Sequence, residues 1–330
     1  MFEEREISFS EAEELLSRCG LYPVDNADIR IGIFAPDGEL AATGALVGNM
    51  LQMIAVDESF QGEDLAARVV SSLISRAISL SRRRVYLFTK SKNVPTFRGI
   101  GFRLVADVRD GAALLEWGRP GIDEYCAGLK KLNPGVNKTG CIVMNANPFT
   151  LGHRYLAEKA AAECEKVFIL AVEENLSEFP FEARLAMLKA GTADLENITV
   201  IPGGRYVISS LTFPAYFSRD ALRSRQQSQV DAAIFEKYIA PSLGVTDRYV
   251  GEEPFSESTC IYNEVLAETL KSCALHTVPR LELYGNAVSA SRVRQLIKEG
   301  KREQAYNLLP KTTAEYIAKH EQEVDAWLRK

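Results

Sequence analysis

From about residue 140 onward, short apolar runs alternate with longer stretches in which apolar residues recur at helical spacing. The apolar runs lie at 141–144, 167–172, 198–202, 247–250 and 277–283, and the helical stretches at 152–166, 181–190, 230–239, 262–273 and 292–299. An apolar run that is joined to the next one through a helix pairs with it most readily in parallel. The alternation therefore favours an α/β fold with a parallel sheet in this part of the chain.

The first third of the chain has a different pattern, typical of an α+β unit. Strands are expected at 29–34 and 40–47, because these segments flank Pro36-Asp37-Gly38, a turn signal of a hairpin. A helix is expected over 65–80, where apolar residues recur every three to four positions.

Glycine and proline become frequent between residues 118 and 140. Such a change in composition is typical of a boundary between domains. We therefore expect two domains, the first at 1–132 and the second at 133–330.

The segment Asn147 to His153 connects the apolar run 141–144 to the helical stretch that begins at Gly152. A helix start presents unpaired backbone N–H groups and a partial positive charge, which makes it a site for phosphate. His153 can add a side-chain donor in the same turn. This arrangement suggests a protein that handles a nucleoside triphosphate by attack at its α-phosphate.

Composition excludes several other classes of protein. A net charge of −5 and a pI near 5.5 argue against a dedicated DNA-binding protein. No apolar run reaches the length of a membrane span, and the N-terminus is too acidic for a signal peptide. The six cysteines are scattered, with none at metal-ligand spacing. We expect a cytoplasmic protein with reduced thiols that binds neither nucleic acid nor membrane.

Two short segments resemble the signatures of the nucleotidyltransferase superfamily. Asn147 to His153 resembles the (T/H)xGH signature, and Val288 to Arg294 resembles the second signature, ISSTxxR. Either match alone is weak, but both occur in the right order across a Rossmann-like span. The second match is incomplete, because Val-Ser-Ala-Ser keeps hydroxyl groups at two positions and loses one.

The resemblance narrows to the citrate lyase ligase family, also called acetate:SH-citrate lyase ligase. It is carried by residues 143–155, 206–217, 249–263 and 288–294. Members of that family pair an N-terminal acetyltransferase-like domain of the GNAT type with a C-terminal HxGH nucleotidyltransferase domain. This order agrees with the two domains expected above.

The resemblance implies an ATP-dependent acetylation of a thiol. Acetate and ATP would give acetyl-adenylate and pyrophosphate, and the acetyl group would pass to the phosphoribosyl-dephospho-CoA arm on the acyl carrier subunit of citrate lyase. Acetate is already ionised at pH 7 and needs no general base. We therefore expect the positioning of the substrates and electrostatic stabilisation to contribute most of the catalysis. Mg²⁺ is expected on the triphosphate, held by phosphate oxygens and water rather than by a dedicated protein site.

The same resemblance assigns catalytic roles to His153, Thr150 and Arg294. His153 would donate to an α-phosphate oxygen, Thr150 would supply a hydroxyl in place of the first histidine of the commoner signature, and Arg294 would hold the β- and γ-phosphates. The implied ATP-binding residues are Asn145, Asn147, Pro148, Phe149, Gly152, Ser289, Ser291 and Arg292. Asn147 stands where many superfamily members carry an acidic residue.

Other polar positions follow expected strands and are candidates for the pocket wall. They are Tyr206, Ser209 and Ser210 after one strand, and Glu252 and Glu253 after another. The carboxyl edge of a parallel sheet is where ligands bind, although a turn or a solvated loop explains them equally well. Arg184, on an expected helix, can contact phosphates or face water.

In the first domain, residues 61–66 resemble the acetyl-CoA loop of the GNAT acetyltransferases. Gln61, Gly62 and Ala66 are therefore expected to bind the CoA-like arm. Asp64 stands where a glycine is usual, and its carboxylate would repel a pyrophosphate. The alternative is that this domain is a scaffold with a vestigial loop.

Two other functions remain open at this point. One is a plain adenylyltransferase acting on a phosphorylated small molecule such as phosphopantetheine or a mononucleotide, which would not need the first domain. The other is a non-catalytic adaptor that binds an acyl carrier or CoA. Acetate-dependent ATP–pyrophosphate exchange distinguishes the three.

Overall fold

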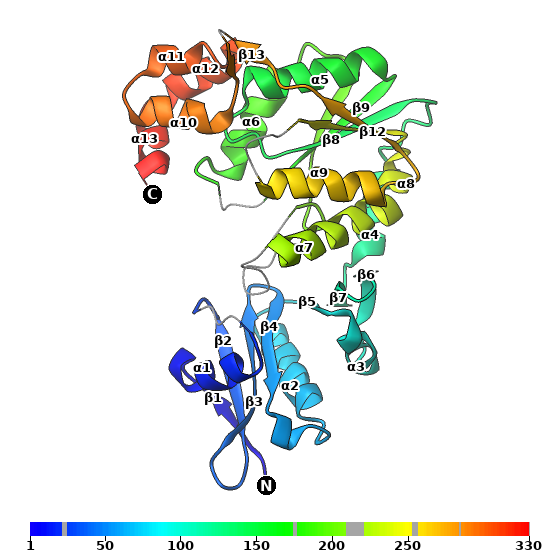
Figure 1. Ribbon diagram of the computed structural model, residues 1–330, viewed down its shortest axis with the longest axis vertical. Helices are drawn as coiled ribbons and strands as arrows, with labels where there is room; N and C mark the ends of the chain where they lie inside the picture. Colours follow the sequence, from blue (N-terminus) through cyan, green and yellow to red (C-terminus); the bar gives the residue numbers. More distant parts are fainter. Residues whose placement is uncertain (22–24, 174–176, 209–220, 253–256, 284, 330) are drawn as a thin grey trace. The chain divides into compact units, whose positions relative to one another are not determined.

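The computed structural model describes residues 1–21, 25–173, 177–208, 221–252, 257–283 and 285–329 (Figure 1). The chain forms two compact units. Unit 1 contains Met1–Tyr125 and Ser210–Ile234, and unit 2 contains Cys126–Ser209 and Phe235–Lys330. The sequence suggested a single break at 132/133. The structure instead divides after Tyr125 and returns a later segment to unit 1. No helix among the described residues is long and apolar enough to cross a bilayer.

Unit 1 is built on a seven-stranded sheet in the order β1-β2-β3-β4-β5-β7-β6. Its strands are β1 (Glu3–Glu6), β2 (Ile29–Phe34), β3 (Leu40–Val47), β4 (Met50–Val56), β5 (Arg84–Lys90), β6 (Arg103–Asp107) and β7 (Ala112–Gly118). All neighbours pair antiparallel except β4 and β5. These two pair in parallel through only Met50–Leu51 and Tyr86–Leu87. The rest of β4 is therefore unpaired with β5, which leaves an opening in the sheet.

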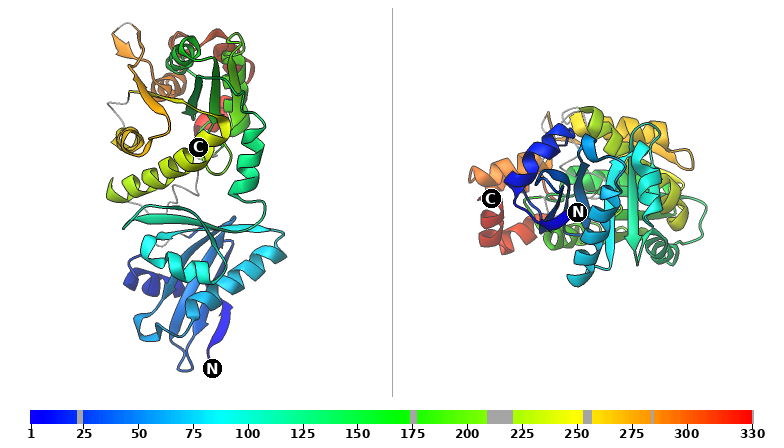
Figure 2. Two further views of the ribbon diagram at one scale, coloured as in Figure 1. Left: turned by 90° about the vertical axis from the view of Figure 1, so that its right-hand side faces the viewer. Right: turned by 90° about the horizontal axis from the view of Figure 1, so that it is seen from below.

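Helices cover both faces of this sheet (Figures 1 and 2). The helix α2 (Leu65–Ser79) packs on β2, β3 and β4 in one apolar cluster with Leu46. The helix α1 (Phe9–Arg18) belongs to a second cluster that contains Ala45. Successive residues of a strand point to opposite faces, so Ala45 and Leu46 place the two helices on opposite sides.

Three shorter elements complete unit 1, namely the 3₁₀ turn η1 (Glu58–Phe60), η2 (Ser91–Asn93) and the helix α3 (Val94–Gly99). The helix α7 (Ala221–Ile234) also belongs here, because it packs on β6 and β7. This contact explains why residues far along the sequence return to the first unit. The division between units falls within α4 (Ile122–Lys130).

Unit 2 contains a five-stranded sheet in the order β10-β9-β8-β11-β12, parallel throughout. The strands are β8 (Thr139–Met144), β9 (Lys166–Ala171), β10 (Ile198–Pro202), β11 (Asp247–Gly251) and β12 (Ala274–Val278). The predicted α/β fold with a parallel sheet is confirmed. The chain runs outward from β8 to β10 and then resumes on the other side of β8. The sheet therefore reverses its direction of growth between β8 and β11, where ligands bind in folds of this kind.

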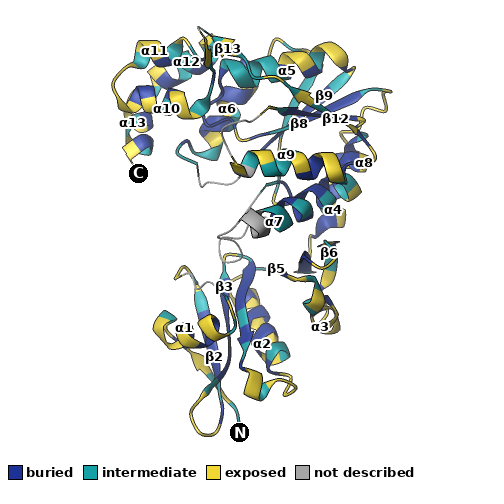
Figure 3. Ribbon diagram, in the orientation of Figure 1, coloured by how far each residue is buried: buried dark blue, intermediate teal, exposed yellow. Residues whose placement is uncertain are grey.

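The helices of unit 2 that follow strands are α5 (Leu151–Glu163), α6 (Phe181–Gly191) and α9 (Glu257–Thr269). A π-helical turn (Phe235–Ile239) and α8 (Ala240–Leu243) precede β11. The two-stranded β13 (Glu282–Leu283) and β14 (Asn286–Ala287) lead to α10 (Ala290–Lys298), α11 (Arg302–Tyr306), α12 (Lys311–Lys319) and α13 (Glu321–Arg329). One apolar cluster joins the sheet, α5, α6 and these last helices, and its buried faces are dark blue in Figure 3.

Candidate active site

Unit 2 has a cavity of about 340 Å³ at the carboxyl edge of its sheet. The segments that follow β8, β11 and β12 contribute to its wall. The starts of α5 and α10 also contribute, with Thr150, Gly152, His153, Ser289, Ala290 and Ser291. The two signature segments, far apart in the sequence, therefore line one cavity.

Thr150 and His153 hold each other at the start of α5. Thr150 is the N-cap, and its Oγ1 accepts the backbone N–H of His153 at 3.4 Å. In return, Nδ1 of His153 accepts the backbone N–H of Thr150 at 3.0 Å and lies 2.9 Å from Oγ1 of Thr150. Because a backbone N–H can only donate, Nδ1 carries no proton, and a neutral ring must carry its proton on Nε2. The ring thus has one N–H donor left for the cavity.

The imidazole of His153 is neutral at physiological pH. Burial lowers its pKa to about 4, and the positive charge of Arg280 acts in the same direction. A neutral ring also preserves the acceptor role of Nδ1 toward Thr150. The site therefore presents a fixed hydrogen-bond donor without a positive charge at this point.

An aromatic side chain stacks against the ring of His153. Phe149 is fully buried and stacks on His153, with ring centroids 5.9 Å apart and an interplanar angle of 18°. Gly191, at the end of α6, makes room for it, because a Cβ at that position would stand 2.4 Å from the Phe149 ring. Pro148 and Phe149, which the resemblance assigned to ATP binding, are both buried, and Phe149 supports the ring of His153.

The two signature segments contact each other through Gly152. A Cβ on this residue would stand 3.3 Å from the carbonyl oxygen of Val288. Directly after Val288, Ser289 caps α10 by accepting the backbone N–H of Arg292 at 3.2 Å. The starts of α5 and α10 are therefore neighbours, as a shared phosphate site requires. Arg292 itself is exposed and is not among the described residues that line the cavity.

Arg294 ties the second signature to the first. Its Nη1 donates to the backbone carbonyl of Asn147 at 2.6 Å, and its Nε pairs with Glu178 at 3.0 Å. Nδ2 of Asn147 donates to the other oxygen of Glu178 at 2.7 Å, and Oδ1 of Asn147 accepts the backbone N–H of Phe179 at 3.0 Å. Asn147 therefore anchors the turn. Arg294 is not among the described lining residues of the cavity.

Arg184 neither faces water nor is directed at a phosphate site, contrary to both readings of the sequence. It is only 1% exposed, and it donates to the backbone carbonyls of Phe179, Asn145 and Val172 at 2.7 to 3.0 Å. Its Nη1 also donates to Oδ1 of Asn145 at 2.8 Å. Asn145 lines the cavity and also hydrogen-bonds to Ser177. Arg184 thus holds together the loops that follow β8 and β9.

The remaining candidate residues for the pocket wall of unit 2 differ in their positions relative to the cavity. Tyr206 is buried, and it is not among the described residues that line the cavity. Glu252 lines the cavity and donates its backbone N–H to Val278. Ser209, Ser210 and Glu253 lie outside the described residues.

Two charged residues at the site were not found by inspection of the sequence. Arg280 lines the cavity two residues beyond the end of β12, and Glu178 pairs with Arg294. Arg280 follows the carboxyl end of a strand, which is a usable signal. Glu178 had no signal in the sequence, because its importance comes only from contacts with Asn147 and Arg294.

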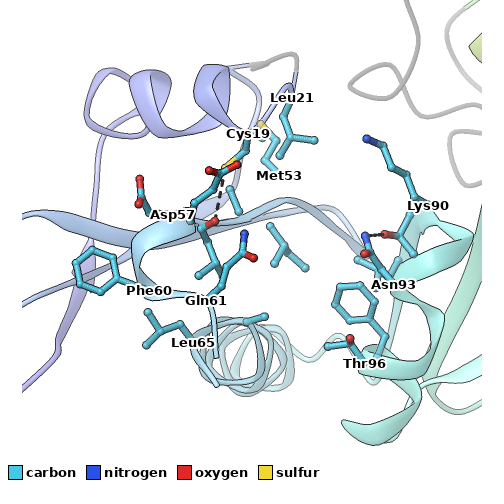
Figure 4. Close-up of a pocket in the computed structure, with 18 of the residues that line it drawn as sticks. Cys19, Leu21, Met53, Asp57, Phe60, Gln61, Leu65, Lys90, Asn93 and Thr96 are labelled. Atoms are coloured by element: carbon cyan, nitrogen blue, oxygen red, sulfur yellow. Dashed lines mark hydrogen bonds between the residues drawn. The ribbon is translucent and has the colours of Figure 1, made fainter. Parts of the chain in front are cut away.

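Unit 1 contains a larger cavity, of about 1040 Å³, beside the opening between β4 and β5 (Figure 4). Gln61, Gly62 and Ala66 are all among its lining residues. Gln61 and Gly62 precede α2, and Ala66 lies in its first turn. The three candidates for binding a CoA-like arm therefore share one wall of one cavity.

Asp64, the N-cap position of α2, also lines this cavity. It has a φ of 53° and makes no side-chain cap hydrogen bond. The left-handed backbone conformation is one that glycine adopts more readily. The exposed carboxylate thus stands at the helix start where an anionic group would bind.

A five-stranded parallel sheet, with the starts of α5 and α10 beside each other at its switch point, makes unit 2 a Rossmann-like α/β domain. The family model of the citrate lyase ligase C-terminal domain matches residues 139–317. The [citrate [pro-3S]-lyase] ligase of Escherichia coli (strain K12) is 38% identical over 289 residues, which cover 85% of this chain and 82% of that protein. The chain belongs to the citrate lyase ligase family and is an enzyme of the ligase class.

A second relative and two solved structures are also similar to this chain. The ligase of the same name from Klebsiella pneumoniae is 36% identical, over 88% of this chain and 87% of that protein. A putative acyl-CoA N-acyltransferase from Klebsiella pneumoniae covers 36% of this chain and 97% of its own, with 15% identity and a TM-score of 0.31. A Bacillus subtilis acetyltransferase solved with CoA covers 36% and 98%, with 19% identity and a TM-score of 0.30.

Proposed function

We propose that this enzyme uses ATP to activate acetate and then acetylates the acyl carrier subunit of citrate lyase. An oxygen of acetate attacks the α-phosphorus, the bond from this phosphorus to the bridging oxygen of the β-phosphate breaks, and pyrophosphate leaves. The thiol of the CoA-like prosthetic group then attacks the acetyl carbon, AMP leaves, and the thiol proton is released. The relatives' names support the target, and the cavity in unit 2 supports the chemistry.

The observation that carries the proposal is the fixed tautomer of His153. Its Nδ1 is occupied by Thr150, so Nε2–H is the donor available to an α-phosphate oxygen. A donor aimed at charge that develops in the transition state contributes about 3–4 kcal/mol. The ring is neutral, Thr150 holds its Nδ1 and Phe149 stacks on its face. The ring therefore need not move when negative charge develops on the phosphate oxygen.

The start of α10 is the proposed site for the β- and γ-phosphates. Ser289 and Ser291 line the cavity there, and the helix start adds backbone N–H groups. Among the described residues, no group of three or more His, Cys, Asp or Glu side chains could hold a metal. Mg²⁺ that accompanies ATP would then be bound by phosphate oxygens and water, and would offset their negative charge.

The cavity in unit 1 is the proposed receptor for the CoA-like arm. Gln61, Gly62 and Ala66 line it at the start of α2, which is a helix of 15 residues. Gly62 has a φ of 100°, so the backbone turns there without a side chain in the way of an approaching ligand. The opposing charge of Asp64 makes this a weak site for a free pyrophosphate, and we expect the carrier protein to supply part of the affinity.

Acetate-dependent exchange of labelled pyrophosphate into ATP tests the first half-reaction. Exchange that requires acetate, followed by acetylation of the carrier, supports the ligase. Exchange that requires a phosphorylated acceptor instead would identify an adenylyltransferase. Binding of the carrier without any exchange would identify an adaptor.

A further inference from the structure

Asn145 is an exposed residue in a buried turn. It is the first residue after β8, and it lines the cavity of unit 2. Met144, Ala146 and Asn147, which surround it in the chain, are all buried. Ala146 has a φ of 50°, a left-handed conformation that residues with a Cβ rarely adopt. Unusual backbone conformations of this kind are concentrated at functional sites, and this one lies directly beside the side chain that reaches the cavity.

Arg184 fixes the orientation of the Asn145 amide. Its Nη1 donates to Oδ1 of Asn145 at 2.8 Å and to the backbone carbonyl of the same residue at 2.9 Å. A guanidinium has no acceptor atom, so the amide atom that faces it must be the oxygen. Arg184 is only 1% exposed and also donates to the carbonyls of Val172 and Phe179. The amide is therefore held by a side chain that is itself fixed.

This orientation leaves a hydrogen-bond donor at the cavity. The amide nitrogen Nδ2 lies on the side away from Arg184, where it donates to Oγ of Ser177 at 3.0 Å. Nδ2 carries two N–H groups, and within the described ranges Ser177 is the one acceptor that it contacts. The remaining N–H is a second neutral donor for a ligand in this cavity, in addition to Nε2–H of His153.

Asn145 and His153 lie where the two reacting groups must meet. Asn145 directly follows β8, His153 lies in the first turn of the next helix, and both line one cavity. An acetate oxygen must come within about 3–3.5 Å of the α-phosphorus before it attacks. The group that holds acetate must therefore lie beside the group that holds the α-phosphate.

A neutral donor suits a carboxylate that has to react. One N–H can hold one oxygen of the carboxylate in place, while the other oxygen keeps its electron pair for the attack on phosphorus. A full positive charge would stabilise the ground state of acetate more strongly, and this raises the barrier unless the transition state gains equally. The remaining N–H of Asn145 therefore fits the role of a carboxylate anchor.

We infer that Asn145 binds the carboxylate of the substrate acid through Nδ2–H, and that Arg184 is a positioning residue that orients this amide. The inference rests on the proposed function. It changes the role that the resemblance gives to Asn145 from ATP binding to binding of the acid. It also gives Arg184, which lies outside both signatures, a part in the first half-reaction.

The first experiment measures acetate-dependent pyrophosphate exchange over a range of acetate and ATP concentrations. Asn145→Ala should raise the KM for acetate about 10- to 100-fold, as expected for loss of a hydrogen bond to a charged group, with little change in the KM for ATP. Asn145→Asp keeps an oxygen toward Arg184 and should fold as wild type does. It should bind acetate more weakly than Asn145→Ala, because a carboxylate replaces the donor and repels the substrate.

Asn137→Ala is the matched control, because Asn137 is exposed and precedes the same strand that Asn145 follows. It should leave both KM values unchanged. Arg184→Lys should raise the KM for acetate without raising the KM for ATP, since one ammonium group cannot serve the carbonyls and Oδ1 of Asn145 together. A purely structural role of Arg184 would lower the melting temperature and leave the KM for acetate as in wild type.

The second experiment observes the Asn145 amide directly in the wild-type enzyme, by nuclear magnetic resonance of its side-chain NH2 group. The signal is assigned by its disappearance in Asn145→Ala, and it should shift when acetate is added. Cross-relaxation should connect the NH2 protons to Ser177 and not to the guanidinium of Arg184. This measurement needs no substitution of Arg184, so it tests the orientation even if Arg184→Lys does not fold.

Three results would overturn the inference. They are full exchange activity of Asn145→Asp, an increase of the KM for ATP rather than for acetate in Asn145→Ala, and NH2 protons that face Arg184. Failure of the proposed function looks different, because wild-type enzyme would then show no acetate-dependent exchange. If the Asn145 signal still shifts with acetate in that case, the carboxylate site stands without the reaction, and if it does not shift, the inference fails as well.

Discussion

Gly152 faces the backbone carbonyl of Val288 so closely that a Cβ there would stand 3.3 Å from its oxygen. Gly152 belongs to the first turn of α5, and Val288 directly precedes the cap of α10. The absence of a side chain therefore sets the spacing between the two helix starts that form the proposed phosphate site. This spacing can be tested without disturbing any polar group.

Gly152→Ala should lower the exchange rate, because a Cβ that stands 3.3 Å from the carbonyl oxygen of Val288 requires this segment to shift by a few tenths of an ångström. The matched control is Gly128→Ala in α4, where a Cβ would meet nothing within 4 Å. Pyrophosphate exchange should show an activity loss only for Gly152→Ala, and thermal unfolding checks that both variants are folded. Full activity of Gly152→Ala would mean that this spacing is unimportant.

His153→Ala should reduce acetate-dependent exchange about 100- to 1000-fold, the usual effect of losing one donor to a transition-state oxyanion. MgATP binding should change far less, because the ground state gains little from this contact. Single-turnover formation of acetyl-adenylate, followed with labelled acetate, separates the two effects. A variant that exchanges at the wild-type rate would remove His153 from the mechanism.

The stability of unit 2 should fall on acidification because of His153. Its folded pKa, about 4, lies below the ordinary value of 6.5, so the unfolded chain binds the proton more readily. The contribution is complete above pH 6.5 and is lost as the pH falls toward 4. Melting temperatures measured between pH 7 and 4.5 should therefore decline more steeply for wild type than for His153→Gln. Parallel curves would contradict the lowered pKa of the His153 ring.

Asp64→Gly and Asp64→Asn should both increase acetyl transfer to the carrier, by a few-fold at low salt. Both remove the charge that opposes an anionic arm, while glycine and asparagine each tolerate the left-handed backbone at φ 53°. Acetate-dependent pyrophosphate exchange should not change, since the first half-reaction is assigned to unit 2. If transfer is unchanged at every salt concentration, the cavity of unit 1 does not receive the arm.

Arg184→Met should lower stability, by about 1–3 kcal/mol for each buried carbonyl left without a donor. The contacts with the carbonyls of Val172, Phe179 and Asn145 are all lost. Lys189→Gln, exposed on the same helix, removes an equal charge and should leave the melting temperature unchanged. Equal melting temperatures for both variants and wild type would show that Arg184 is not needed to hold the loops.

Helices and strands could be predicted from the sequence where the spacing of apolar residues was clear. The helix expected at 65–80 is α2, and the alternation after residue 140 is the parallel sheet. The strand expected at 277–283 is instead divided between β12 and β13. Pro279 lies at this break, and a proline cannot donate to a strand ladder.

Features that depend on tertiary contacts could not be predicted in the same way. The order of the signatures in the sequence indicated that the two segments belong to one site. The position of the proton on His153 follows instead from the hydrogen bond that the backbone N–H of Thr150 donates to the ring. Arg184 and Arg294 are both helix arginines in the sequence, and only the surrounding carbonyls and Glu178 distinguish them. The position of α7 in unit 1 depends on β6 and β7, more than one hundred residues earlier in the chain.

That placement of α7 has a consequence for the synthesis of the chain. The sheet of unit 1 is complete when Gly118 has been made, but the helix that packs on β6 and β7 emerges only after β8, β9 and β10. On the ribosome, the β6 and β7 part of this sheet must therefore stay without its α7 cover while half of the next unit is translated. A shortened gene product that ends before residue 221 would keep every strand of that sheet and still expose the surface of β6 and β7 that α7 covers to chaperones and proteases.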